Sequence, residues 1–592
     1  MRGPPAPPPR HATLVEALLA AAGHPSGVTF VDLREREERL SWGEVAARAR
    51  RAAARLAAAG VAPGDRVALV LRTEPLFLDA LLGALLAGAV PVPLYPPVRL
   101  GRLEEWIEST ARMIAAAGAR LVVSGGASRR LLGEAVRRAG PALGWLPAEE
   151  LAAGREELLR SPSPDDLCLV QFSSGSTVDP KPVALTHAAV CAQVAALTAL
   201  VRPSAADVLV SWLPLYHDMG LIGCLLGAMG YPGPLVLIAP EHFLARPALW
   251  LRALSRHRGT VGAAPSFAFA YAAERVRDEE LAGHDLSAVR LLLDGAEPVS
   301  CEALRRFAGR FAPFGLDPRG LLPVYGLSEA ALAVTFAPPR WPPRSLRADA
   351  RALAAGEGLR PGTREIASVG RPVPGAEVEV RGPDGRALPA GALGRIHVRS
   401  PSLMREYLGQ PAATAAALPG GWLDTGDLGF EVDGELYVHG RAKDVVVVRG
   451  ANHAPEEFEE CLAGLPGLRP GCAVAVGAAA EDGAEGLVLL AERAARAPAA
   501  RDPALAEVVR RAVTERTGVA PREVRILAPG TLPRTSSGKL RRGEALRRLL
   551  AGSLSPPAPV TALRLARDLA RSAVALARVR RAAGAGRRAR RG

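Results

Sequence analysis

Lysine is the rarest charged residue of this sequence, because only three of its 74 basic residues are lysines and all the others are arginines. The three are Lys181, Lys443 and Lys539. A lysine kept in such a chain is a candidate for chemistry that a planar guanidinium cannot perform, since the ammonium group is a compact charge on a flexible stem. Each lysine could also persist by chance, so its surroundings must decide.

Lys181 follows a run of small hydroxyl residues in QFSSGSTVDPKPVALTH, which occupies positions 171–187 between an apolar strand and a helical stretch. Backbone amides and hydroxyl groups in such a loop can surround phosphate oxygens. The candidate groups are Ser173, Ser174, Gly175, Ser176 and Thr177. A flexible linker has a similar composition, and the loop lacks the Walker pattern of glycine, four residues, glycine and lysine, so by itself this signal is weak.

Lys539 stands in LPRTSSGKLRR, where the four residues before the lysine form a tight turn that presents it. An exposed loop before a helix is the alternative. Lys443 lies in a segment, 421–460, that is dense in charged residues between β runs and includes Asp427 and Arg441. A carboxylate held in a rigid β frame suits a ribose, because its two oxygens can accept bonds from both hydroxyls.

Polar groups also occur near the ends of other apolar strands. His217 lies in SWLPLYHDMGLIG, where a polar triplet interrupts an apolar segment and needs either partners or a function. A core histidine bonded to a neighbouring carbonyl is the alternative. The glycine turns in LLLDGAEPVS and LPVYGLSEAALAV each follow a strand. In the second, Tyr325 offers a ring for stacking a base and Glu329 a carboxylate for Mg²⁺.

Alternating helical and strand patterns must position these groups. From residue 12 to about 123, and again from 167 to about 334, helical stretches alternate with short apolar strands, which favours α/β units with parallel strands. Beyond residue 368, short β runs with turn signals predict hairpins. We therefore predict an α/β protein whose large N-terminal domain, residues 1–442, contains two α/β subdomains and a β-rich subdomain.

The rest of the chain divides into a second domain and a tail. Residues 443–552 mix strands and helices on a smaller scale, which predicts a small, mobile α+β C-terminal domain joined by a hinge. Residues 553–592 hold ten arginines and one aspartate, so this tail carries +9 of the formal net charge of +14. Leu565, Leu569 and Leu576 fall near one helical face, so we expect either a disordered tail or an amphipathic basic helix.

Length and composition exclude several classes of protein. With 592 residues, 49% of them hydrophobic, the chain can form at least two packed cores. The six scattered cysteines fit neither a disulfide framework nor a zinc site and favour a reducing cytoplasm. Prolines interrupt the N-terminal region where a secretory signal would be apolar, which argues against such a signal. A proline turn divides the uncharged stretch 221–240 into pieces that are too short to span a membrane. We expect a cytoplasmic monomer with no specific nucleic-acid partner.

These segments occur in the order and at the distances of one superfamily. The Ser/Gly loop, YGLSE, WLDTGD, GRAKD and PRTSSGK resemble the adenylate-forming superfamily of acyl-CoA synthetases, luciferases and nonribosomal adenylation domains. The resemblance covers about residues 13–550, and all three lysines fall inside its motifs. It implies an enzyme that uses ATP and Mg²⁺ to join a carboxylate to AMP with release of pyrophosphate.

The resemblance also implies a role for each candidate residue. Lys539 would place positive charge between the carboxylate and the α-phosphate, which repel each other. His217 would lie beside the reacting carboxylate, and Glu329 would help to hold Mg²⁺. Asp427 would bind the ribose, and Lys443 would mark the hinge about which the small domain rotates. Further ATP-binding groups would come from the Ser/Gly loop with Lys181 and from Asp294, Gly295, Ala296, Tyr325, Gly326, Ser328 and Arg441.

The Ser/Gly loop departs from the usual pattern of the superfamily. Pro182 stands where many relatives have glycine, and Val178 also differs. Proline restricts the backbone of the residue before it, so Lys181 is biased toward an extended conformation. The departure puts the mobility of the loop in question.

Several local features resemble the fatty acyl-AMP ligase branch in particular. They are VPVPLYPP, SWLPLYHDMG, AAPSFAFAYAAERV, DGAEPVS followed by FAPFGLDP, and GANHAPEEFEE. LYHDMG stands where an amino-acid adenylation domain has a phenylalanine-aspartate pair. The long stretch between Glu329 and Ser368 matches the place of an insertion that is held to hinder the rotation needed for CoA thioesterification. The acceptor implied is therefore the phosphopantetheine thiol of a separate acyl carrier protein, and the substrate a fatty acid.

Two other functions stay open from the sequence. One is a medium- or long-chain fatty acyl-CoA ligase. The other is a non-catalytic basic binding protein built on a ligase scaffold, against which the intact Lys539, Asp427 and Glu329 argue. For the basic tail, solvated extension is one interpretation, and docking to an acidic carrier protein or weak contact with an anionic membrane surface is the other.

Overall fold

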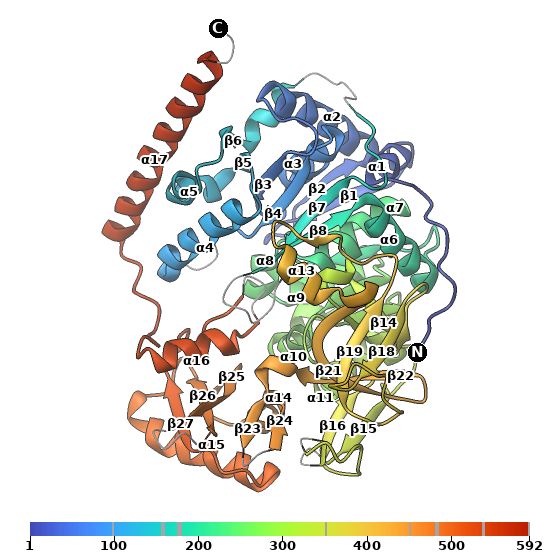
Figure 1. Cartoon of the computed structure of the whole chain (residues 1–592), viewed down its shortest axis with the longest axis vertical. Helices are drawn as coiled ribbons and strands as arrows, with labels where there is room; N and C mark the ends of the chain where they lie inside the picture. Colours follow the sequence, from blue (N-terminus) through green and yellow to red (C-terminus); the bar gives the residue numbers. More distant parts are fainter. Residues whose placement is uncertain are drawn as a thin grey trace.

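The structure is a computed structural model that describes residues 1–97, 100–154, 160–173, 180–349, 352–353, 355–448, 451–479, 485–535 and 539–589. A large N-terminal part and a small C-terminal part lie side by side, and the last helix returns from the small part to the first subdomain (Figure 1). Six cysteines are buried as free thiols. Among the described residues, no helix combines the length and the apolar character needed to cross a membrane.

The first subdomain is built on a four-stranded parallel sheet with the order β4-β3-β5-β6. Residues of β3 alternate between two cores: Val67 and Leu69 face α2 and α3, whereas Ala68 and Val70 face α4 and α5. Helices on both faces explain why the strands are apolar throughout. The elements are α2 (Trp42–Ala58), β3 (Arg66–Val70), α3 (Pro75–Leu86), β4 (Val90–Leu94), α4 (Leu103–Ala116), β5 (Leu121–Ser124), α5 (Gly126–Ala139) and β6 (Gly144–Pro147).

The second subdomain contains a nine-stranded sheet with the order β17-β14-β13-β12-β11-β9-β10-β1-β2. Its central strands are parallel, so their carboxyl ends meet at one edge, where ligands bind in folds of this kind. The strands are β1 (Gly27–Val31), β2 (Glu37–Ser41), β9 (Leu209–Ser211), β10 (Leu235–Ile238), β11 (Val261–Ala264), β12 (Leu291–Asp294), β13 (Leu321–Gly326), β14 (Ala333–Phe336) and β17 (Arg371–Pro372). The helices that matter below are α6 (His187–Val201), the π-helical segment η3 (Met219–Leu226), α7 (Gly227–Gly230) and α11 (Cys301–Phe311).

The uncharged stretch 221–240 folds as the sequence predicts. The segments η3 and α7 end at a turn, and β10 follows as a buried strand. A separate three-stranded antiparallel sheet, in the order β20-β8-β7, carries the strands on either side of the Ser/Gly loop. These strands are β7 (Leu167–Phe172), β8 (Pro182–Thr186) and β20 (Glu406–Tyr407).

Four antiparallel strands in the order β18-β19-β21-β22 form the β-rich subdomain, which confirms the predicted hairpins. They are β18 (Glu377–Arg381), β19 (Gly394–Arg399), β21 (Leu423–Val432) and β22 (Glu435–Arg441). The turn between β21 and β22 consists of Asp433 and Gly434, both at positive φ, which is the backbone geometry that tight hairpins favour.

The stretch that matches the expected insertion folds onto this sheet. β15 (Ser345–Ala348) and β16 (Arg364–Ala367) pair as antiparallel strands. Their core contains Leu353 and Ile366, packed with the stacked rings of Phe430 and Tyr437. Arg364 donates to Nδ1 of His439 at 3.1 Å and to its carbonyl at 3.2 Å, close to the end of β22.

The small C-terminal part has its own two-sided core around the sheet β25-β26-β27. Along β26, Leu487 and Leu489 pack toward α15, whereas Val488 and Leu490 pack toward α16. Its elements are β23 (Val446–Val448), β24 (Ala451–His453), α14 (Pro455–Glu459), β25 (Leu468–Ala479), β26 (Glu485–Arg493), α15 (Asp502–Thr517), β27 (Glu523–Leu527) and α16 (Arg542–Leu550).

The basic tail forms a helix, α17 (Ala562–Ala589), which lies against α5 and β6 of the first subdomain (Figure 1). Leu576 is buried there, and Leu565 and Leu569 pack against the same core. The backbone amide of Gly133 donates to the Ser572 hydroxyl at 2.8 Å. A Cβ at Gly133 would lie 2.0 Å from the Ser572 carbonyl oxygen, so this close approach requires glycine.

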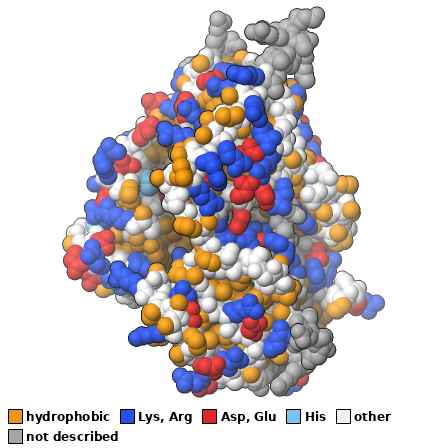
Figure 2. Space-filling view, turned by 90° about the vertical axis from the view of Figure 1, so that its left-hand side faces the viewer, with side chains coloured by type: hydrophobic (Ala, Val, Ile, Leu, Met, Phe, Trp, Pro, Cys, Tyr) orange, Lys and Arg blue, Asp and Glu red, His pale blue; other side chains and the backbone are white. Residues whose placement is uncertain are grey.

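Of the two expectations for the tail, the structure therefore shows the amphipathic helix. Its apolar side is covered by α5, so that side is not presented to a lipid surface. The opposite side exposes Arg567, Arg571 and Arg578. Figure 2 views the molecule from the side on which α17 lies and shows basic side chains interspersed with acidic and hydrophobic ones.

The docking of α17 leads to a prediction about local stability. Leu576→Ala removes buried apolar atoms and should weaken the docking of the helix by about 2 kcal/mol. Hydrogen exchange of backbone amides in residues 562–581 should accelerate accordingly. Leu563→Ala is the matched control, because Leu563 lies on the same helix and is 83% exposed. Equal exchange in the two variants would show that α17 is not held by this contact.

Candidate active site

A cavity of about 890 Å³ lies between the strand ends of the second subdomain, the β-rich subdomain and the small C-terminal part. Both predicted strand-end motifs contribute to it, as do residues of α6 and η3. Of the sequence-predicted residues, it is lined by Ser173, Lys181, His217, Ala296, Tyr325, Gly326, Ser328, Glu329, Asp427, Arg441, Lys443 and Lys539. The fold thus brings most of the predicted groups together from positions more than 350 residues apart in the chain.

One corner of the cavity combines a tyrosine, a carboxylate and an arginine. The Tyr325 hydroxyl donates to Oδ2 of Asp427 at 2.7 Å, and Nε of Arg441 lies 3.4 Å from Oδ1 of Asp427. Burial raises the pKa of Asp427, while the Arg441 charge opposes this rise. An aromatic ring beside a buried carboxylate can bind a base and a sugar diol together.

The position of Tyr325 depends on a sharp reversal of the chain after β13. A Cβ at Gly326 would lie 1.8 Å from the carbonyl oxygen of Leu332, so only glycine fits between the two strands. Ala331 adopts φ +62° in the same turn. The turn carries Ser328 and Glu329 directly into the cavity wall.

His217 and Asp218 form a second polar pair. Nδ1 of His217 lies 2.6 Å from Oδ1 of Asp218, and the Ser328 hydroxyl donates to Oδ2 of Asp218 at 2.5 Å. Burial opposes ionisation of Asp218, but the His217 ring and the Ser328 hydroxyl hold its pKa below the usual range. Nε2 of His217 is buried and has no hydrogen-bond partner among the described residues, so it is available to a ligand.

Glu329 lies on the side of the cavity that carries the Ser/Gly loop. The Tyr407 hydroxyl donates to its Oε1 at 2.8 Å, and Nζ of Lys181 lies 4.5 Å from the centre of the Tyr407 ring. Burial raises the pKa of Glu329. The Lys181 backbone amide donates to the Ser173 hydroxyl at 3.3 Å. The other predicted members of the loop, Ser174, Gly175, Ser176 and Thr177, lie outside the described residues, as does Val178.

The three residues of the Asp-Gly-Ala turn differ in their placement. Ala296 lines the cavity at φ +71°, whereas Asp294 is fully buried behind the wall. The Ser266 hydroxyl donates to Oδ2 of Asp294 at 2.6 Å, and burial raises the pKa of Asp294 well above its usual range. Gly295 packs against Val324 with no room for a side chain. Asp294 and Gly295 therefore shape the wall, and Ala296 alone of the three faces the ligand space.

Lys539 reaches the cavity from the small C-terminal part, at the start of the segment that precedes α16. Its backbone amide donates to the Thr535 hydroxyl at 3.0 Å. Burial, together with the Arg441 charge, lowers the pKa of Lys539, while Asp218 and Glu297 act against this lowering. Lys443 lies between β22 and β23, where the chain passes into the small part, and its exposed side chain stands at the rim.

Part of the cavity lining is apolar and comes from α6, η3 and α7. On α6 this lining recurs at helical spacing, with Val194, Leu197, Thr198 and Val201 on one face. The facing wall comes from η3 and α7 and includes Gly223, Gly227 and Ala228. Small residues on one wall and branched ones on the other leave room for a flexible apolar chain.

Sequence reasoning missed several polar residues of the cavity lining, of which Glu297 and Tyr407 are examples. Glu297 follows the Asp-Gly-Ala turn, and its Oε1 accepts a bond from the backbone amide of Phe267 at 2.6 Å. Tyr407, the partner of Glu329, lies in a short strand that has no recognisable motif. The position next to a predicted turn could have drawn attention to Glu297, but nothing in the sequence near Tyr407 could have done so.

Comparisons with known proteins agree with this geometry. Residues 19–408 match the family described as AMP-binding enzyme. The chain is 36% identical to a putative acyl-CoA synthetase of Caulobacter vibrioides, over 91% of this chain and 96% of the relative. It is 33% identical to the long-chain-fatty-acid–AMP ligase FadD26 of Mycobacterium marinum, over 86% of this chain and 91% of the relative.

A solved structure from studies of fatty acyl-adenylate ligases of E. coli and L. pneumophila superposes with a TM-score of 0.86. It is 33% identical and covers 92% of this chain and 99% of that one. The fold and the cavity shared by two unequal parts define an adenylate-forming ligase. The chain belongs to the AMP-binding enzyme family, which confirms the predicted superfamily and the α/β fold class.

The corner formed by Tyr325 and Asp427 leads to a prediction for nucleotide binding. Asp427→Asn replaces a charged acceptor, so we expect the KM for ATP to rise about 10- to 100-fold, as for the loss of a charge-assisted hydrogen bond. The KM for the carboxylate substrate should change little. Asp433→Asn, in the exposed turn of the same hairpin, is the control, and initial rates at varied ATP measure both. An unchanged KM for ATP in the Asp427 variant would exclude the ribose assignment.

Proposed function

We propose that this enzyme is a fatty acyl-AMP ligase, which converts a fatty acid and ATP into acyl-AMP and pyrophosphate. The observation that carries the proposal is that Lys539, His217 and Asp427 line one cavity, which also has an apolar lining from α6, η3 and α7. The names of the M. marinum ligase and of the fatty acyl-adenylate ligase structures support a fatty acid as the carboxylate.

Lys539 has the central role in this proposal. A carboxylate oxygen forms a bond to the α-phosphorus of ATP, while the bond from that phosphorus to the pyrophosphate oxygen breaks and pyrophosphate leaves with the electron pair. The two reacting groups are both negative, so positive charge in a cavity of low dielectric lowers the barrier most when it lies between them. Lys539 supplies that charge from the small part.

The other residues hold the substrates. Asp427 would accept bonds from the ribose hydroxyls, Tyr325 would stack on the base, and Ala296 and Gly326 would face the nucleotide. When protonated, His217 can donate from Nε2 to the fatty carboxylate while Nδ1 donates to Asp218. Lys181 and the Ser/Gly loop would contact the outer phosphates.

Glu329 fits a role in holding Mg²⁺. Its carboxylate offers a hard oxygen ligand on the cavity wall. Among the described residues, no group of three or more His, Cys, Asp or Glu side chains could hold a metal ion by itself. Mg²⁺ would be bound by this one carboxylate together with substrate phosphates, whose charge it would neutralise.

The role of Lys539 leads to a prediction with two measurements. Lys539→Ala should reduce acyl-AMP formation about 10²- to 10³-fold and leave ATP binding largely intact, because the charge acts mainly in the transition state. Product formation is followed with a labelled fatty acid, and ATP binding by calorimetry. Wild-type yield from the variant would remove Lys539 from the mechanism.

The pH dependence tests the same residue independently. The pKa of Lys539 lies below its usual value near 10.5, so the ammonium charge is present below that lowered pKa and is lost as the pH rises through it. Wild-type acyl-AMP formation should therefore decline on the alkaline side, and the residual activity of Lys539→Ala should not show this decline. A parallel decline in both proteins would assign it to another group.

The acyl acceptor is the second part of the proposal. We infer that the acyl group passes to the phosphopantetheine thiol of a separate acyl carrier protein and only poorly to CoA. Arg364 in the folded insertion donates two hydrogen bonds to His439, which lies in β22 four residues before Lys443. The insertion is therefore bonded to the strand that leads into the hinge. The exposed arginines of α17 would suit an acidic carrier protein. An acyl-CoA ligase is the alternative, which the name of the C. vibrioides relative favours.

The insertion allows the two acceptors to be distinguished. With fatty acid, ATP and CoA, the intact protein should accumulate acyl-AMP and form little thioester, whereas removal of residues 345–366 should increase thioester formation with CoA. Labelled products are separated after offering CoA and carrier protein side by side. Efficient acyl-CoA formation by the intact protein would establish the alternative function.

A further inference from the structure

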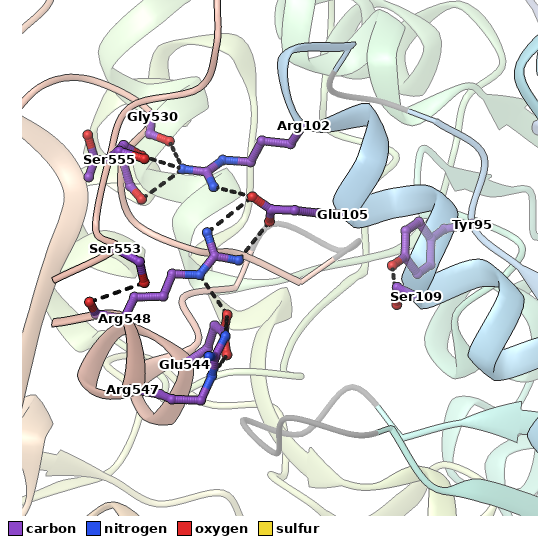
Figure 3. A network of polar contacts seen from close by, with 11 residues as sticks. Tyr95, Arg102, Glu105, Ser109, Gly530, Glu544, Arg547, Arg548, Ser553 and Ser555 are labelled. Atoms are coloured by element: carbon purple, nitrogen blue, oxygen red, sulfur yellow. Dashed lines mark hydrogen bonds and ion pairs between the residues drawn. The ribbon is translucent and has the colours of Figure 1, made fainter. Parts of the chain in front are cut away.

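A cluster of ionic contacts connects the small C-terminal part to α4 of the first subdomain (Figure 3). Glu105 stands at its centre. Nη1 of Arg102 donates to Oε1 of Glu105 at 2.7 Å, and Arg548 of α16 donates to both oxygens of Glu105, at 3.2 and 2.7 Å. Nε of Arg548 also donates to Oε1 of Glu544 at 2.6 Å.

Arg102 makes a second set of contacts with backbone carbonyls. Its Nη2 donates to the carbonyl oxygens of Gly530 at 3.1 Å, Thr531 at 3.0 Å and Ser555 at 3.1 Å. One guanidinium therefore joins α4, the small part and the segment that leads to α17. The side chains of Arg102 and Arg548 are only 12% and 13% exposed, whereas that of Glu105 is 48% exposed, so the cluster is a partly buried network with its carboxylate at the surface.

The exposed chain after α16 approaches both parts closely near the same contact. A Cβ at Gly101 would lie 2.8 Å from the carbonyl oxygen of Ala558, and one at Gly530 would lie 3.3 Å from the side chain of Pro557. The segment thus passes between two glycines, one from each part of the molecule. It then continues into α17, which is docked on α5.

The contacts flank the segment that carries Lys539. Gly530 and Thr531 precede the lysine by eight or nine residues, and Arg548 follows it by nine. Between these two attachment points, Arg534 and Leu540 form an isolated antiparallel β-bridge, and α16 begins. Both ends of the Lys539 segment are therefore attached to α4.

We propose that Arg102, Glu105 and Arg548 are positioning residues, which hold the small part in the orientation that keeps Lys539 inside the cavity and so favour acyl-AMP formation over thiol transfer. The proposal rests on the proposed function of Lys539. The cluster lies outside the cavity lining, so it acts only through the placement of the lysine.

The charge state of Glu105 agrees with this role. Burial would raise its pKa, but the hydrogen bonds and charges of Arg548 and Arg102 bring it below the usual range. The cluster is therefore ionised at neutral pH. Rotation of the small part would break the bonds of Arg548 to Glu105 and those of Arg102 to the carbonyls of the small part, so the attachment opposes the rotation that thiol transfer requires.

Neighbouring residues supply matched controls. Arg548→Met removes the bonds to Glu105, whereas Arg547→Met removes an arginine that bonds to Glu544 on the same helix and is 55% exposed. Glu105→Gln removes only a charge, and Glu104→Gln does the same one position earlier, at a residue paired with Arg138.

Single-turnover formation of acyl-AMP tests the proposal, with KM values for ATP and fatty acid measured in parallel. Arg548→Met and Glu105→Gln should each slow the step about ten-fold, because a small misplacement of a catalytic group lowers the rate of the chemical step. Both KM values should stay unchanged. The fraction of acyl-AMP that reacts with added CoA should rise. Both control variants should behave as the wild type.

Other outcomes are equally decisive. Rates of the Arg548 and Glu105 variants equal to those of their controls would overturn the positioning role, as would a loss of rate accompanied by a matching rise in the KM for ATP. If Arg548→Met melts at a lower temperature, Glu105→Gln decides, because it preserves shape and volume. Absence of acyl-AMP formation by the wild-type protein with any fatty acid would instead contradict the proposed function.

Discussion

The chemistry of this site depends on one electrostatic constraint: a carboxylate and a triphosphate, both negative, must come within bonding distance. Lys539 meets this constraint from the small part, whereas His217 and Asp427 line the cavity from the large part. Catalysis therefore depends on how two parts with separate hydrophobic cores are held relative to one another. The parallel strands supply a rigid edge, and the small part supplies the charge.

The rigid edge owes its geometry to a few steric requirements. Gly326 lets the chain reverse beside Leu332, which places Tyr325 and Glu329 on the cavity wall. Buried carboxylates would be costly alone, and most here have a partner: Asp218 has His217 and Asp427 has Tyr325 and Arg441. These partners stabilise buried carboxylates in a cavity that must also bind a negatively charged carboxylate and triphosphate.

Much of the fold and of the site could be predicted, because motifs that follow parallel strands converge at the strand ends. Tyr325 and Glu329 follow such a strand, whereas Asp427 lies in the antiparallel strand β21 and was assigned to the site through the family resemblance. The sequence could not show that Ala296 faces the cavity whereas Asp294 is buried behind its wall, because Asp294 is held there by a bond from Ser266, which is distant in the sequence. The periodicity of the tail left a helix and a disordered segment both open and indicated no partner for it, because Ser572 meets Gly133 from 439 positions away. Long-range packing of this kind leaves no local pattern.

The return of α17 to the first subdomain changes the topology of the connection between the two parts. The small part is joined at Lys443 and again through residues 551–561, so it resembles a domain inserted into the large one more than an appended one. Such a closed loop keeps the effective concentration of the small part high even when the hinge is open. A single cut of the backbone near Lys443 would therefore leave Lys539 tethered close to the cavity, whereas in a chain ending at α16 the same cut would release it.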